Sequence, residues 1–316
     1  MRLRLAVLAC LSAVPAHADV AEAVGQVIVP ATAALSARAD ELAMAARGCD
    51  PAAMRPAFAA ASEGWMRVQH LNLGPLAEAG RAQAMNYWPD PKDKGAAAQA
   101  ALIAAADPAA LAALPAPARG LAALERLIWA DPPPAGYACD LLAATAADFA
   151  ANAHAVAAGW REGLAPALIH PGAPGPYLTE AEAKTALLTQ ISLGLDGLGD
   201  DRLGRPLGSF HRPRPDRAEA ILSGRSLANI RAALAALRAE AAALVPEAPL
   251  TMAAFDRAEK LAADLHDPVF AGVAEPSGRL KVEILQQAIH ATRDAAMSEM
   301  SASLGVTLGF NAADGD

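Results

Sequence analysis

Residues 120–129 read GLAALERLIW, and this stretch is the most informative part of the chain about its fold. At about 100° per residue, one side of an α-helix collects the apolar side chains Leu121, Leu124, Ile128 and Trp129. Glu125 projects into that apolar stripe, between Leu121 and Trp129. A carboxylate among apolar groups costs several kcal/mol unless it is paired, hydrogen-bonded or metal-bound. We therefore predict an amphipathic helix in which Glu125 meets a polar partner from another segment.

The rest of the chain is also helical in pattern, because apolar periodicity and Pro/Gly breaks recur without an alternating strand pattern. Hydrophobic residues make up 54% of the chain, and much of this fraction is alanine, the best helix former. The sequence therefore predicts an all-α protein. The expected helices cover residues 20–47, 51–72, 75–86, 94–106, 117–130, 138–164, 179–198, 216–243, 250–265 and 278–303. Helix-entry signals stand at Asp50-Pro51, at Thr179 with Glu182, and at Pro215-Asp216.

The main break in the helical pattern is HPGAPGP at residues 170–176, which no helix can cross. It separates residues 19–170 from residues 171–316. Each part holds at least four expected helices, so we predict two four-helix, up-and-down bundle domains packed together. A second irregular stretch, residues 203–215, is too long for a simple turn, and long ordered loops often carry function.

Residues 1–18 have the pattern of a secretory signal peptide. Arg2 and Arg4 precede an apolar segment over residues 5–14, which is too short to span a bilayer, and small residues follow at the cleavage point. An alternative interpretation is a lipoprotein leader that is processed at Cys10. The sequence after the leader has no uninterrupted apolar run of about 20 residues, so no transmembrane span is expected. We predict an exported protein of the periplasm or cell envelope.

Two cysteines, Cys49 and Cys139, stay in the chain after leader removal. Two cysteines in an exported chain suggest one disulfide, and we predict that Cys49 and Cys139 form it. The alternative is two separate buried thiols. The formal net charge is −8 and the chain has no basic run, which argues against nucleic acid as a partner.

Polar residues in two other segments could meet Glu125 or a ligand. Trp88 and Asp90 belong to a loop over residues 86–94, where aromatic rings, acids and lysines could form a binding rim. Alternatively, the rings plug the end of the bundle and Asp90 caps the next helix. Gln69 lies on an otherwise apolar helical face and could bond Glu125, or it could lie in the fraying end of its helix.

A later segment, residues 223–230, places Arg225 and Asn229 four residues apart, with Ser226 between them. A guanidinium fork suits bidentate pairing with a buried carboxylate, so Arg225 could neutralise Glu125. The alternative is a surface arginine near the start of a helix. We predict a cleft between the two halves, and its candidate lining residues are Glu125, Asp90, Trp88, Gln69, Arg225, Ser226 and Asn229.

The chain resembles the imelysin-like family of bacterial cell-envelope proteins. The resemblance covers nearly all of the mature chain, about residues 24–300, and rests on an ordered set of motifs. These are YWPDPKDK at 87–94, RGLAALERLIW at 119–129, YACDLL at 137–142, GLGDDRLGRPLGSFHRPRPDRAEA at 197–220, GRSLANI at 224–230 and GFNAADGD at 309–316. The resemblance implies two helical bundles with a functional site at their interface, in an exported protein often associated with iron acquisition.

The family's hallmark is Gly-x-His-x-x-Glu, and the matching positions are Gly120, Ala122 and Glu125. An alanine methyl group cannot ligate a metal, which argues against the peptidase activity first described for imelysins. The resemblance therefore implies a non-catalytic binding or accessory protein in iron or metal acquisition. Its partner would be a small ligand or a metal ion such as iron, with other envelope or iron-uptake proteins as further candidates.

Two alternatives remain open for Glu125. In the first, the protein is a metallopeptidase with a divergent metal site, in which Glu125 is a ligand or base and His154 or His290 supplies the missing ligand. In the second, Glu125 is structural and pairs with an arginine that fixes how the two halves dock. A cluster of oxygens and a histidine beside Glu125 would favour a metal site, whereas a bidentate arginine would favour a structural role or an anionic ligand.

Overall fold

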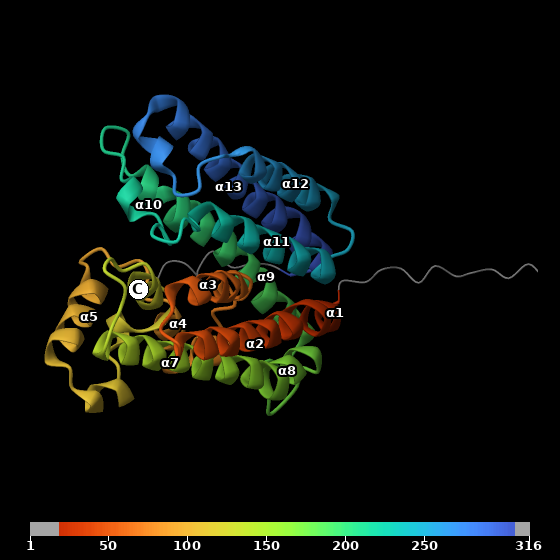
Figure 1. Ribbon diagram of the computed structural model, residues 1–316. Helices are drawn as coiled ribbons and strands as arrows, with labels where there is room; N and C mark the ends of the chain where they lie inside the picture. The colour runs from red at the N-terminus through yellow and green to blue at the C-terminus, as the bar shows by residue number, and fades with distance from the viewer. Residues whose placement is uncertain (1–18, 307–316) are drawn as a thin grey trace, which may run out of the picture.

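The protein is all-α (Figure 1). The computed structural model describes residues 19–306, and no β-strand occurs among them beyond isolated bridges at Asn86–Gly120 and Ser209–Arg212. The predicted fold class is therefore confirmed. The predicted signal peptide and the motif at 309–316 lie outside the described residues.

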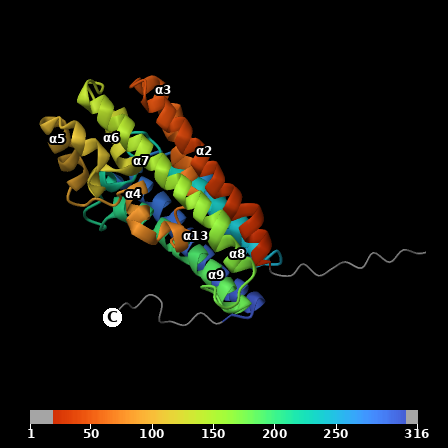
Figure 2. The same cartoon turned by 90° about the horizontal axis from the view of Figure 1, so that it is seen from below.

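Three long rods dominate the first half of the chain, where α2 packs against both α3 and α7 (Figure 2). The first rod is α1 (Val20–Glu22), a π-helical segment (Ala23–Ile28) and α2 (Val29–Ala46); the second is α3 (Pro51–Met66); the third is α7 (Tyr137–Gly159), a π-helical segment (Trp160–Leu164) and α8 (Ala165–Ile169). Shorter helices complete this half: α4 (Arg81–Met85), α5 (Lys94–Ala105) and α6 (Gly120–Ile128).

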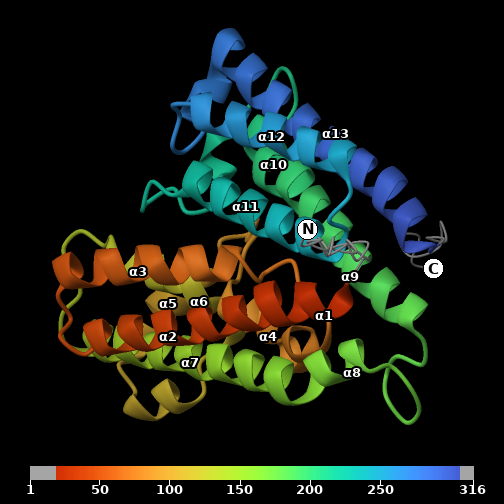
Figure 3. The ribbon, with the colours of Figure 1, turned by 90° about the vertical axis from the view of Figure 1, so that its right-hand side faces the viewer.

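The second half lies on one side of the first; α11 contacts α3 of the first half, and α9 also contacts α1 and α8 (Figure 3). Its elements are α9 (Glu180–Asp196), a π-helical segment (Gly197–Leu203), α10 (Gly204–Leu207), α11 (Ser226–Leu244), α12 (Pro249–Asp264) and α13 (Pro276–Leu304). α13 packs on α9 and α12, while α11 contacts α3 on one side and α12 on the other. Buried apolar residues of both halves form one continuous cluster. The division into two bundle domains at residue 170 therefore stays a prediction.

Two of the expected helix starts are confirmed by their caps. Asp50 Oδ1 accepts a hydrogen bond from the Ala52 amide at 2.9 Å, at the start of α3. Thr179 Oγ1 accepts one from the Glu182 amide at 3.2 Å, and Glu182 Oε2 accepts one from the Leu178 amide at 2.7 Å. The second pair is a capping box in which the return bond reaches one residue further back than usual.

Other expected boundaries are wrong. The helix expected over 51–72 ends at Met66, and the helix expected over 75–86 is α-helical only from Arg81. The helix expected over 216–243 begins at Ser226, because Pro215–Arg217 forms a single 3₁₀ turn and the chain then reverses through Gly224, whose φ is +71°. The helix expected over 179–198 continues through its π-helical segment to Leu207, so the irregular stretch starts later than residue 203.

The predicted disulfide is confirmed. Cys49, just after α2, is bonded to Cys139 in the first turn of α7, and their Cα atoms lie 5.5 Å apart. The bond joins residues that are 90 positions apart in the sequence. It therefore fixes the two longest rods of the first half to each other at one end.

Two helical rods are long and apolar enough to cross a membrane by length and composition, Val20–Ala46 and Tyr137–Ile169. The two rods pack on each other, and each gives part of its apolar surface to the core. Core helices of globular proteins pass the same test, so neither rod is a clear membrane span.

Candidate functional site

The start of α6 is fixed by a close backbone approach. Gly120 has a φ of +73° and forms an isolated bridge with Asn86, and a Cβ atom here would collide with the carbonyl of Met85. Glycine is therefore required by both conformation and space. This contact aligns α6 against residues 84–86, so that Glu125 and the Asn86 side chain come to the same region.

Glu125 is buried, with 8% of its surface exposed. Its Oε1 accepts a hydrogen bond from the Ser223 amide at 2.7 Å, and Ser223 is the only residue among 19–306 that donates to this carboxylate. Burial raises the pKa of Glu125 above its ordinary value of 4.5; the bonds from Ser223 oppose the rise, and the negative charge of Glu219 adds to it. The polar partner from another segment is thus a backbone amide rather than an arginine.

Glu125 faces a cavity of about 330 Å³ whose walls come from both halves of the chain. α3 and α6 supply residues from the first half, and the 216–222 turn and α11 supply residues from the second. The Ala122 methyl group also lines this cavity. The main lining side chains are Phe58, Ser62, Trp65, Asn86, Trp88, Asp93, Leu121, Ala122, Glu125, Arg126, Asp216, Glu219, Ile221, Leu222 and Asn229.

A buried polar network closes one side of this cavity. Arg202 Nε donates to Glu219 Oε2 at 2.9 Å, and Asn86 Nδ2 donates to Glu219 Oε1 at 2.7 Å. The Arg202 and Arg205 guanidinium groups lie over the Trp88 ring, at 5.4 and 5.7 Å from its centre. No local signal in the sequence points to Glu219, because its partners are 17 and 133 residues away.

Three of the predicted site residues meet in the cavity: Glu125, Trp88 and Asn229. Asn229 Oδ1 accepts a hydrogen bond from Ser62 Oγ at 3.1 Å, which joins α11 to α3. Ser226 does not line the cavity. It is buried, and its hydroxyl donates to the Glu219 carbonyl, so it holds the turn that carries Glu219.

The other three predicted residues lie outside the cavity. Asp90 accepts bonds from the Lys94 amide at 3.0 Å and the Gly95 amide at 2.6 Å, so it caps α5, and it lines an adjoining hollow of about 260 Å³. Gln69 lines another hollow of about 350 Å³. Trp88 lines the cavity beside Glu125 and both of these hollows. Arg225 forms no ion pair with Glu125 and turns into a separate hollow.

The residues around Glu125 do not fit a resident metal ion. Among residues 19–306 there is no group of three or more His, Cys, Asp or Glu side chains placed to hold one. His154 is hydrogen-bonded to Ser36 and Asp40, and His290 to Asp200; neither histidine lines the cavity. We therefore derive no chemistry from a metal at Glu125.

The chain matches a known protein family and shares its fold with two solved structures. The family model described as Imelysin matches residues 13–296. No curated protein sequence matches the chain. Two solved structures share its fold: an imelysin-like protein from Psychrobacter arcticum 273-4 (TM-score 0.74, 19% identity, 92% of this chain and 96% of that one), and an iron-regulated protein A precursor from Parabacteroides distasonis ATCC 8503 (TM-score 0.74, 14% identity, 92% and 97%).

Proposed function

The chain belongs to the imelysin family, and from that premise we propose that it is an exported, non-catalytic binding protein whose cavity beside Glu125 takes a small, positively charged ligand. The observation that carries this proposal is the state of Glu125 itself. It is a buried carboxylate, held by one residue of the opposite half, at the wall of a cavity. A bound cation would replace the solvation that this carboxylate has lost.

The charge balance of the cavity supports a cationic ligand. Two of its acids are already paired, Glu219 with Arg202 at 2.9 Å and Asp216 with Arg214 at 2.7 Å. Glu125 and Asp93 have no ion-pair partner among residues 19–306. Arg126, whose guanidinium is bonded to Gln99, also lines the cavity and offsets one of these two charges, so a cation would meet a net excess of one negative charge.

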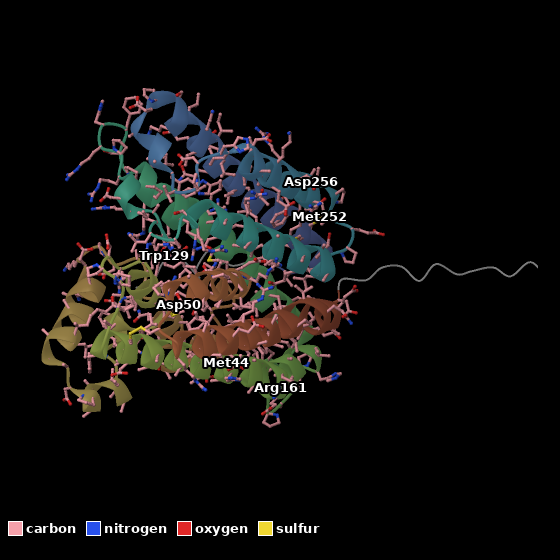
Figure 4. The ribbon with its side chains drawn as sticks, viewed as in Figure 1. Met44, Asp50, Trp129, Arg161, Met252 and Asp256 are labelled. Carbon is pink, nitrogen blue, oxygen red and sulfur yellow. A yellow bond between two sulfur atoms is a disulfide. The ribbon has the colours of Figure 1, made fainter. Side chains whose placement is uncertain are left out.

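Aromatic rings supply the second part of the complementarity. Phe58, Trp65 and Trp88 line the cavity, and aromatic faces attract organic cations. Phe58 also packs edge-to-face on Trp129, with ring centres 5.2 Å apart, which fixes its orientation. Figure 4 labels Trp129 on the side of the first half that faces the second. A ligand with a cationic group and an apolar body would use both features.

The cellular setting of the proposal rests on three lines of support. The disulfide between Cys49 and Cys139 is typical of oxidising compartments, and residues 1–18 have the composition of a signal peptide. The shared fold with an iron-regulated protein A precursor supports an accessory role in iron acquisition. We therefore place the protein in the periplasm or cell envelope, beside other iron-uptake components.

Benzylammonium is a suitable probe, because it joins a cation to an aromatic ring. We expect it to bind the mature protein, measured by calorimetry, and expect Glu125→Gln to weaken binding by about tenfold or more, as loss of a buried charge-assisted contact does. Affinity should increase as pH rises through the pKa of Glu125, since only the ionised carboxylate attracts the cation.

Glu78→Gln is the matched control, because Glu78 is exposed and does not line the cavity. Benzyl alcohol, which lacks the charge, should bind at least about tenfold more weakly. Equal benzylammonium affinity for the wild type and Glu125→Gln would overturn the proposal. Glu125-dependent binding of Fe³⁺ or Zn²⁺ without benzylammonium binding would overturn it in favour of a metal site.

A further inference from the structure

A second hollow, of about 580 Å³, lies where α3, α11 and α12 meet and is lined by none of the residues around Glu125. α11 lies between the other two helices in Figure 3. The floor of the hollow is made of alanines, Ala228, Ala232 and Ala235 on α11 and Ala263 on α12. Because a methyl group fills little space, this row leaves a groove between helices that otherwise pack closely.

The acidic side chains that line this hollow are already paired with arginines. Glu63 is paired with Arg67 at 2.9 Å and approaches Arg38 at 3.9 Å, and the Arg67 guanidinium keeps the pKa of Glu63 below its ordinary value. Glu259 is paired with Arg238 at 2.7 Å, and Arg238 is also bonded to Asp256, which Figure 4 labels on α12. Both acids of the hollow are thus neutralised by arginines, only one of which lines it.

Two arginines of the same hollow, Arg225 and Arg231, have no carboxylate within ion-pair distance in the part of the chain that the structure describes. Arg225 is partly buried, and its Nε atom is buried without an acceptor among those residues. Burial lowers the pKa of this guanidinium, while Glu63 and Glu125 act to raise it. The hollow therefore presents uncompensated positive charge and an unused buried donor.

The two arginines flank the alanine row. Arg225 is the N-cap residue of α11 and Arg231 lies six positions later, which is about 9 Å along the helix axis, and the helical rotation places them at opposite edges of the stripe formed by Ala228, Ala232 and Ala235. A guanidinium group binds a carboxylate through two parallel hydrogen bonds. We propose that this hollow binds a small linear organic dianion, with one carboxylate on Arg225, the other on Arg231, and the carbon chain on the alanine floor.

Adipate, a six-carbon dicarboxylate, is the probe. Calorimetry on the intact, disulfide-bonded protein at low ionic strength should detect binding, and Arg225→Gln and Arg231→Gln should each weaken it by about tenfold or more. Added salt should also weaken it, because Arg231 is exposed. Arg257→Gln on α12 is the matched control, since Arg257 is exposed and does not line the hollow; it should leave adipate affinity unchanged.

Ala228→Leu tests the floor without changing any charge. Ala228 is exposed, so the variant should fold normally by circular dichroism, yet the larger side chain should occupy the groove and weaken adipate binding several-fold. Three results would each overturn the proposal. They are no adipate binding by the wild type at millimolar concentration, equal weakening by Arg257→Gln, and hexanoate binding as tight as adipate binding. None of these results bears on Glu125, so this test is independent of the benzylammonium test.

Discussion

Replacing Glu240 by alanine is expected to lower the free energy of unfolding by about 3–5 kcal/mol, the usual loss when one partner of a buried polar pair is removed. Glu240 lies on α11, and His70 follows α3. The Glu240 Oε2 and His70 Nε2 atoms are 2.7 Å apart, and each side chain is 1% exposed. Their remaining polar atoms, His70 Nδ1 and Glu240 Oε1, have no partner among residues 19–306. The variant would leave the imidazole buried with no partner at all.

Urea denaturation of the mature protein measures this loss. Glu259→Ala is the control: Glu259 lies on neighbouring α12 in a more exposed pair with Arg238, so its loss should cost no more than about 1 kcal/mol. Replacing both His70 and Glu240 by alanine should cost less than the sum of the two single replacements, since neither partner is then left alone. A cost for Glu240→Ala no larger than that for Glu259→Ala would contradict the expected cost of breaking the buried His70–Glu240 pair.

Loss of the Cys49–Cys139 disulfide should lower the free energy of unfolding by about 4–5 kcal/mol. The bond closes a loop over a sequence separation of 90 residues, so its removal gives the unfolded chain much more conformational freedom. The double variant Cys49→Ser, Cys139→Ser, compared with the oxidised wild type by urea denaturation, measures the effect.

Reduction of the wild type by a thiol-free reductant should reproduce the shift, and the same reductant should leave the double variant unchanged. The mature chain after the expected leader has only these two cysteines, so no other disulfide can account for a response. A difference of less than about 1 kcal/mol would contradict this prediction, because it would mean that the reduced, unfolded chain already keeps the two cysteine-bearing segments close together.

Local signals in the sequence predicted those features that depend on nearby residues. The caps at Asp50 and Thr179 lie within three residues of the groups they bind, and both helix starts were correct. Pro215-Asp216 has the same local appearance, yet it starts only a 3₁₀ turn. The reversal that follows makes tertiary contacts, such as the bonds from Asn86 to Glu219 and from the Ser223 amide to Glu125, which no local signal shows.

The candidate site was predictable only in part, for the same physical reason. The burial of Glu125 followed from helical periodicity alone. Its partner did not, because the donor is the backbone amide of Ser223, and every residue type except proline carries one. The pairing expected for Arg225 failed because the turn directs its side chain into the other hollow, away from the carboxylate.

The desolvation of Glu125 has a consequence for stability. Because burial raises its pKa in the folded chain above 4.5, the folded state binds this proton more tightly than the unfolded state does. The contribution of Glu125 to stability is therefore present at acidic pH and is lost as pH rises from about 4.5 through the folded pKa. A cationic ligand acts in the opposite direction, since it favours the ionised carboxylate.

The most direct measurement is an NMR titration of the Glu125 carboxyl group in the mature protein with ¹³C-labelled glutamate, assigned by the signal that Glu125→Gln removes. We expect Glu125 to titrate above 4.5 in the free protein, and we expect saturating benzylammonium to lower this pKa. A Glu125 carboxyl that titrates at or below 4.5, with no change on addition of benzylammonium, would contradict it.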